Sequence, residues 1–187
     1  MSNRSQTLSW LRAFGYFLIE ALALAPSAWA DVSGGISTDG TMGAGQILNG
    51  ANLTVPQSLG TTVGNNLFHS FTEFNIANGQ TVRFTGSDAL HNVVSRVTGT
   101  DVTEIEGTLR STIANAAFYF INPNGITFGT GAQVNVPGAF HISTADKIDF
   151  ANHGGSFYAD SNQTSTLSAE APAAFGFLGT STANNGL

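Results

Sequence analysis

The sequence contains no cysteine and carries little charge. Of 187 residues, six are Lys or Arg and twelve are Asp or Glu, so the net charge is −6. The absence of cysteine excludes disulfides, thiolate catalysis and every cysteine-based zinc or iron–sulfur site. A single lysine, Lys147, and the negative balance argue against nucleic acid as a partner, because neutralising phosphates requires clustered Lys and Arg.

Low charge does not indicate disorder in this chain. Hydrophobic residues make up 42% of it and include 14 Phe, so it can bury a core of the size expected for one domain. The four histidines are scattered, without the spacing of a zinc-binding pair, and we expect them to be solvated or hydrogen-bonded on strands. Dinucleotide-binding, P-loop and calcium-repeat motifs are absent, and the sequence predicts no metal and no cofactor.

Residues 1–30 differ in composition from the rest. Two arginines precede an apolar stretch, which ends in the small–x–small sequence Ala28-Trp29-Ala30 before Asp31. This arrangement is typical of a secretory signal peptide that is removed on export. We expect cleavage between Ala30 and Asp31 and a single domain over residues 31–187.

The sequence after residue 30 predicts a series of short strands. From Gly40 to Phe150, apolar and polar residues alternate and Gly or Asn-Gly turns interrupt the pattern, as in half-buried strands. The region from Ala114 to Phe120 is the best short exception, with a helical pattern. The expected strands are residues 81–85, 92–98, 102–106, 118–121, 126–128, 134–136 and 140–142.

The sequence therefore predicts an all-β fold. The residues alone do not decide between two architectures. A sandwich fits the turn spacing in part. A parallel β-helix is favoured by the low charge and the short strands, because like charges stacked on neighbouring rungs would repel each other. No strict repeat decides between them. In a β-helix, residues 31–60 would cap the open sheet edge.

Candidate catalytic residues are sparse. Glu104 and Glu106 share one face of a strand, and Asp146 and Asp149 lie three apart. Polysaccharide cleavage requires two carboxyl groups across a cleft, whereas neighbouring acids on one face form a solvated edge. No G-x-S-x-G motif places a nucleophilic serine. The sequence therefore predicts no catalytic residue.

The segment with the most specific content is Asn122-Pro123-Asn124-Gly125. Proline fixes its own φ and extends the preceding residue, and Asn-Gly readily forms a tight turn. We expect a rigid polar corner between two strands, which a partner can recognise at low entropic cost.

Several ordered motifs run from about Ile36 to Leu178. They are Gly64–Phe71 with Phe74-Asn75, Asn92–Gly99, Gly107–Ser111, Asn122–Gly125, Phe140–Ala145 and Ala173–Leu178. Together these stretches resemble the N-terminal secretion domain of filamentous-haemagglutinin-like exoproteins of two-partner secretion (TPS) systems.

The resemblance implies a right-handed parallel β-helix with an N-terminal cap and a non-enzymatic role. It implies that the chain passes unfolded through the periplasm of a Gram-negative bacterium, that the POTRA domains of an outer-membrane transporter recognise it, and that it folds outside the cell. Asn122, Pro123, Asn124 and Gly125 match the motif linked to secretion. A second family segment, to which we assign a structural role, comprises Asn66, Leu67, Phe68, His69, Ser70 and Phe71.

Family members usually continue through further rungs into a long region with adhesin, haemolysin or toxin activity. We therefore expect the secretion domain to be incomplete at its C-terminal end, and host-cell or surface glycans to be partners of a downstream region. Two alternatives from other classes are a β-helix carbohydrate-active enzyme and a glycan-binding surface protein.

Overall fold

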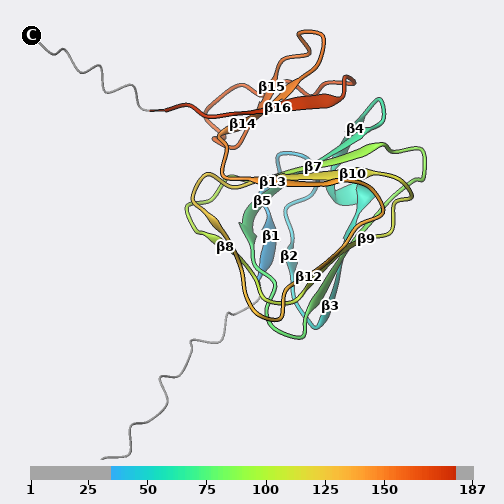
Figure 1. Ribbon diagram of the computed structural model, residues 1–187, viewed down its shortest axis with the longest axis vertical. Helices are drawn as coiled ribbons and strands as arrows, with labels where there is room; N and C mark the ends of the chain where they lie inside the picture. The colour runs from blue at the N-terminus through green and yellow to red at the C-terminus, as the bar shows by residue number, and fades with distance from the viewer. Residues whose placement is uncertain (1–34, 180–187) are drawn as a thin grey trace, which may run out of the picture. The chain divides into compact units, whose positions relative to one another are not determined.

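The computed structural model describes residues 35–179. They form an all-β solenoid of about four turns, in which strands from successive turns stack in parallel. Figure 1 shows three sheets of this solenoid as the sides of a triangle. The all-β prediction is therefore confirmed, and the parallel β-helix is confirmed over the sandwich. The predicted signal peptide and its cleavage between Ala30 and Asp31 lie outside the described residues.

Sheets A and B contribute one strand to each turn, and sheet C contributes shorter or fewer strands. The strands of sheet A are β5 (Asn66–Phe74), β7 (Asn92–Val97), β10 (Ala117–Ile121) and β13 (Phe140–Ser143). Those of sheet B are β3 (Asn52–Pro56), β6 (Thr81–Thr85), β9 (Thr108–Ser111) and β12 (Gln133–Asn135). Those of sheet C are β8 (Thr103–Ile105) and β11 (Ile126–Phe128), and an isolated bridge from Ile76 to Ile105 extends it.

Antiparallel strands close the N-terminal edge of sheet A. Strand β1 (Ile36–Thr38) pairs with β5, and β2 (Ile47–Leu48) pairs with β1. Strand β4 (Thr61–Val63), which follows a short 3-10 helix at Gln57–Leu59, folds back on β5. These strands occupy the backbone edge that an open stack would leave exposed, which agrees with the expected cap.

A separate three-stranded sheet, sheet D, packs outside the solenoid. It consists of β14 (Lys147–Phe150), β15 (Ser156–Tyr158) and β16 (Pro172–Gly176), and all its pairings are antiparallel. Figure 1 shows it beside the face formed by β7, β10 and β13. The alternation of the sequence did not predict these three strands.

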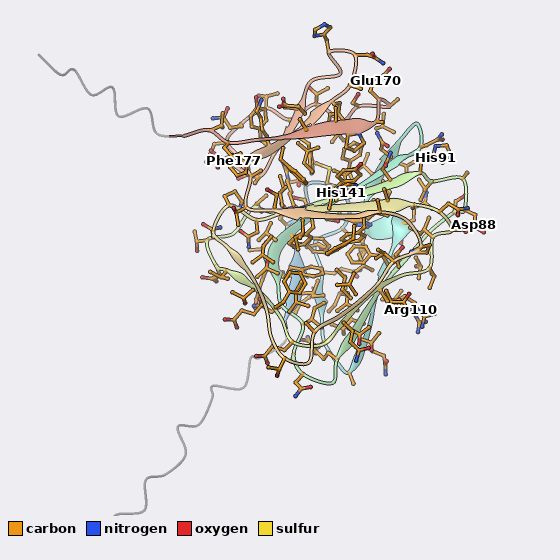
Figure 2. The ribbon with its side chains drawn as sticks, in the orientation of Figure 1. Asp88, His91, Arg110, His141, Glu170 and Phe177 are labelled. Carbon is orange, nitrogen blue, oxygen red and sulfur yellow. The ribbon has the colours of Figure 1, made fainter. Side chains whose placement is uncertain are left out.

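Apolar ladders fill the interior of the solenoid. Leu67, Val93, Phe118 and Phe140 lie in register on successive strands of sheet A, and the first three are fully buried. Phe84 of sheet B meets Phe118 at a ring-centroid distance of 4.8 Å. Figure 2 shows the space between the three sheets filled by such side chains.

Strands β5 and β7 of sheet A are buried on both faces over most of their length. The residues of β5 that point away from the interior include Phe68, which pairs in register with Val94 of β7. Both are fully buried against Phe150 and Phe157 of sheet D. Strand β5 is therefore a nearly continuous buried run, without the alternation that marks a strand with one solvated face.

The spacing along the chain explains why no repeat was found. Residues stacked in register lie 26 apart from Asn66 to Asn92, 25 from Asn92 to Ala117 and 22 from Phe118 to Phe140. The solenoid is regular in space while its loops differ in length, so a fixed-period search fails. The helical pattern noted from Ala114 to Phe120 was wrong, because Ala117–Ile121 form strand β10 in the middle of sheet A.

Candidate functional site

The sequence Asn122-Pro123-Asn124-Gly125 forms the corner between β10 and β11. The Gly125 N–H donates to the carbonyl of Asn122 at 3.2 Å, which closes a four-residue turn. Gly125 has φ of 128°, a backbone conformation that favours glycine. The rigid corner expected from the sequence is present in this form.

Asn122 is fully buried and its side chain holds the corner together. Its Nδ2 donates to the Asp101 carbonyl at 3.0 Å and to Thr103 Oγ1 at 2.9 Å. Its Oδ1 accepts from the backbone N–H of Asn124 at 3.0 Å and from Asn124 Nδ2 at 3.1 Å. The amide thus ties the turn to the neighbouring rung and leaves no group of its own free for a partner.

The exposed part of the corner is Asn124, with Pro123 half-buried beside it. Asn124 Nδ2 also donates to the Gly99 carbonyl at 2.8 Å. A groove of about 360 Å³ runs along Pro123 and Asn124, and Asp146 and Leu178 line its other side. The corner therefore presents a fixed amide and a proline ring at the edge of an open groove.

Replacing Asn122 by alanine should lower the free energy of unfolding by about 1–3 kcal/mol, because the Asp101 carbonyl and the Thr103 hydroxyl lose their buried donor. The same change at exposed Asn124 should cost less than about 1 kcal/mol. Urea unfolding of the two variants checks this. Equal losses would mean that the buried amide bonds contribute nothing beyond the turn itself.

The family segment Asn66–Phe71 is the first part of strand β5. The Asn66 Nδ2 donates to the carbonyls of Ser168 at 2.8 Å and Glu170 at 2.7 Å, and its Oδ1 accepts from Asn92 Nδ2 at 2.7 Å. The side chain thereby joins two rungs to the loop before β16. Leu67 and Phe71 point into the solenoid core, and Phe68 points toward sheet D.

The sequence reasoning missed a buried arginine at the centre of these contacts. Arg96 is 4% exposed on the sheet D side of β7. It donates to Ser70 Oγ at 2.7 Å, to the Tyr158 carbonyl at 2.5 Å, to Ser165 Oγ at 3.0 Å and to Thr41 Oγ1 at 3.2 Å. The available signal was its position among the valines of the strand Val93–Val97, because a charged side chain in a buried strand must find partners.

The Arg96 contacts join the cap, sheet A and sheet D. Its guanidinium carbon lies 4.5 Å from the centroid of the Phe157 ring. Asp39 of the cap accepts hydrogen bonds from Ser70 at 2.5 Å and from Thr98 at 2.9 Å. Burial raises the pKa of Asp39, but these bonds outweigh it and the pKa lies below its usual value. The cluster of Asp39, Ser70 and Arg96 is therefore charged and internally hydrogen-bonded.

The expectation for the histidines was wrong at His69. Its side chain is fully buried in the core, and neither ring nitrogen has a hydrogen-bond partner. Burial lowers its pKa to about 4, partly offset by the nearby Leu59 carbonyl. The imidazole takes an interior position on β5 that an apolar residue would otherwise fill. By contrast, His91 and His153 are exposed.

Two of the candidate acids, Asp146 and Asp149, make structural contacts. Asp149 accepts hydrogen bonds from Lys147 at 2.8 Å and from Ser156, and Asp146 accepts from the Leu178 N–H at 2.5 Å. Glu104 lies between the buried residues Thr103 and Ile105 of β8 and so points outward. Among residues 35–179, no group of three His, Asp or Glu side chains is arranged to hold a metal ion.

Residues 35–179 contain no helix with the length and apolarity that crossing a bilayer requires.

Comparison with known proteins connects this fold to secretion. The family model described as "TPS secretion domain" matches residues 34–186. A heme/hemopexin-binding protein of Haemophilus influenzae is 36% identical over 91 residues, which is 49% of this chain and 9% of that protein. The chain thus corresponds to a small part of that relative. No solved structure matches.

The family match covers the described solenoid, its cap and sheet D, and the expected resemblance is confirmed. Proteins with this domain are secreted exoproteins. The chain therefore belongs to the family of TPS secretion domains, the secretion domains of two-partner exoproteins.

Proposed function

We propose that this domain targets its exoprotein to a dedicated outer-membrane transporter, whose periplasmic POTRA domains recognise the corner Asn122–Gly125. We propose further that the domain begins the folding of the exoprotein outside the cell. The single observation that supports recognition is the corner itself, in which a hydrogen bond within the turn and one to the Gly99 carbonyl hold an exposed amide next to an open groove.

The hydrogen bonds that shape the turn lie within four residues. Asn124 N–H bonds to Asn122 Oδ1, and Gly125 N–H bonds to the Asn122 carbonyl. Contacts of such short separation carry little loop-closure entropy, so the turn can form before the solenoid does. A transporter that meets an unfolded chain in the periplasm would therefore find this segment already shaped.

The C-terminal end of the solenoid supports the proposed start of folding. Strands β11, β12 and β13 are the last strands of their sheets among the described residues, and each leaves one backbone edge unpaired. Phe128 of β11 is 46% exposed and Val134 of β12 is 41% exposed on this end. Unpaired edges with apolar side chains form a template on which further β-structure can add.

The recognition proposal predicts that Asn124→Ala weakens binding to the POTRA domains of the transporter encoded beside this gene about tenfold, the effect of losing about 1.4 kcal/mol at an interface. The chain is diluted from denaturant immediately before the binding measurement. Asn122→Ala should weaken binding at least as much, because Asn122 accepts the N–H of Asn124 that shapes the turn.

Asn49→Ala is the matched control. Asn49 is exposed at another Asn-Gly corner, where Gly50 has φ of 122°. This variant should bind as the parent does. Equal weakening by Asn49→Ala and Asn124→Ala, or no weakening by either, would remove the corner from the recognition site.

We propose no enzymatic step for this domain and assign its final location to the outside or the surface of the cell. Adhesin-like activity and binding of glycans belong, in this proposal, to other parts of the exoprotein. The absence of cysteine supports export in an unfolded state, because no disulfide can lock the chain in the periplasm.

A further inference from the structure

His69 places an ionisable ring in the buried interior of the solenoid. The imidazole stands edge-on to Phe84 at a centroid distance of 5.4 Å and stacks on Phe71 at 6.0 Å. On a third side it packs against Gly60, where an added Cβ would lie 2.9 Å from the ring. The side chain is therefore enclosed by aromatic rings and backbone, without room for a hydration shell.

The polar side chain next to His69, that of Ser95, forms no hydrogen bond with it. Ser95 of β7 is paired in register with His69, and both point into the core. The Ser95 hydroxyl and both ring nitrogens of His69 are buried with no hydrogen-bond partner. A neutral imidazole tolerates this at the cost of unmade hydrogen bonds, whereas an imidazolium would be a buried charge with only the nearby Leu59 carbonyl to offset its burial.

Among the described residues, the elements around the ring place no opposite charge against it. Arg83 of β6 is exposed, and Arg96 of β7 lies on the sheet D side of sheet A. Glu73 of β5 accepts a hydrogen bond from Asn75 at 3.0 Å, and η1 and β4 contain no charged residue. No ion pair compensates a proton on His69.

We propose that His69 is an acid-sensitive switch on folding: protonation of its imidazole is compatible with the unfolded chain and incompatible with the closed solenoid. Acid would therefore shift the domain toward the unfolded form. The consequence for export rests on the proposed function, because only a chain whose folding helps to drive translocation would be exported less at low pH. The effect on stability does not depend on that function.

The pKa of His69 in the folded and in the unfolded chain decides how stability changes with pH and over which pH range. In the folded chain burial lowers the pKa of His69 to about 4, whereas an unperturbed histidine has 6.5. Between these values the unfolded chain binds one more proton, so the stability contributed by neutral His69 is present above pH 6.5 and is lost as the pH falls toward 4. The folding equilibrium constant should fall about tenfold for each pH unit in this window.

The carboxylates change the stability of the fold in a lower pH range. The pKa of Asp39 and that of Asp149 are both lowered from 3.8 in the folded chain. Their contributions to stability are present above that value and are lost only as the pH falls below it. A loss of stability between pH 6.5 and pH 4.5 therefore reports on histidine and not on these acids.

The test is urea unfolding of the full chain at several pH values, with two variants. The folding equilibrium constant of the parent should fall about 40-fold from pH 6.5 to pH 4.5. His69→Gln removes the titrating ring and should abolish most of this slope. His153→Asn removes an exposed histidine at φ 60° and should keep the slope of the parent.

A measurement on the parent alone covers the case in which His69→Gln does not fold. With isotope-labelled histidine, the NMR signal of the folded His69 ring should stay that of neutral imidazole down to about pH 5. A ring that titrates near pH 6.5 in the folded chain would overturn the proposal, as would equal slopes in the parent and His69→Gln. Neither result bears on POTRA binding, which the Asn124→Ala experiment tests separately.

Discussion

Replacing Arg96 by methionine should lower the free energy of unfolding by about 3–5 kcal/mol, the usual cost of removing one member of a buried charged cluster. Methionine fills much of the same space but cannot donate to the Tyr158 carbonyl or to the hydroxyls that Arg96 joins. It also leaves the partly buried carboxylate of Asp39 without the positive charge that acts on it. Since domains are stable by only about 5–15 kcal/mol, this loss is a large fraction of the total.

Arg83→Met is the matched control for Arg96→Met. Arg83 of β6 is exposed and pairs in register with exposed Arg110 of β9, which Figure 2 shows at the outer surface. Its replacement removes the same charge without breaking a buried contact, and the free energy of unfolding should change by less than about 0.5 kcal/mol. Comparable losses in the two variants, by urea or thermal unfolding, would show that the Arg96 cluster does not stabilise the fold.

Limited proteolysis should show where the Arg96 contacts act. Because Arg96 donates to the Tyr158 carbonyl and to Ser165, its loss should loosen sheet D and the loop before β16 first. Early cleavage in residues 151–171 of Arg96→Met, compared with Arg83→Met, is the expected pattern. Uniform cleavage along the chain would instead indicate global unfolding alone.

Truncating Phe84 to alanine should lower the free energy of unfolding by about 3–5 kcal/mol. The ring is fully buried and meets Phe118 at 4.8 Å and His69 at 5.4 Å between centroids. It joins sheet B to sheet A across the solenoid interior. The cavity left behind cannot collapse easily, because its walls are strands held in register by neighbouring rungs.

Phe177→Ala is the control for Phe84→Ala. Phe177 follows β16 and is 65% exposed, so its truncation should change the free energy of unfolding by less than about 0.5 kcal/mol. Thermal unfolding of both variants gives the comparison. A small loss in Phe84→Ala would mean that the interior repacks, and that the aromatic contacts across it contribute little.

The all-β class and the position of the corner could be predicted from the sequence. Strands with one solvated face, such as Thr81–Thr85, alternate in the sequence and were predicted with the bounds the structure has. The corner at Asn122–Gly125 was predictable because its turn depends on the φ restriction of proline and on local hydrogen bonds. The family also followed from the sequence, through ordered motifs across most of the chain.

Which strands are buried on both faces, and which polar groups are enclosed, depends on the tertiary structure. Strand Asn66–Phe74 shows no alternation because sheet D covers its outer face, and sheet D comes from residues 147–176. The partners of Arg96 and Asn66 lie 62 and 102 residues away in the chain. His69 is neutral because of rings that the fold brings around it. Such contacts depend on chain closure over long loops, which no local pattern records.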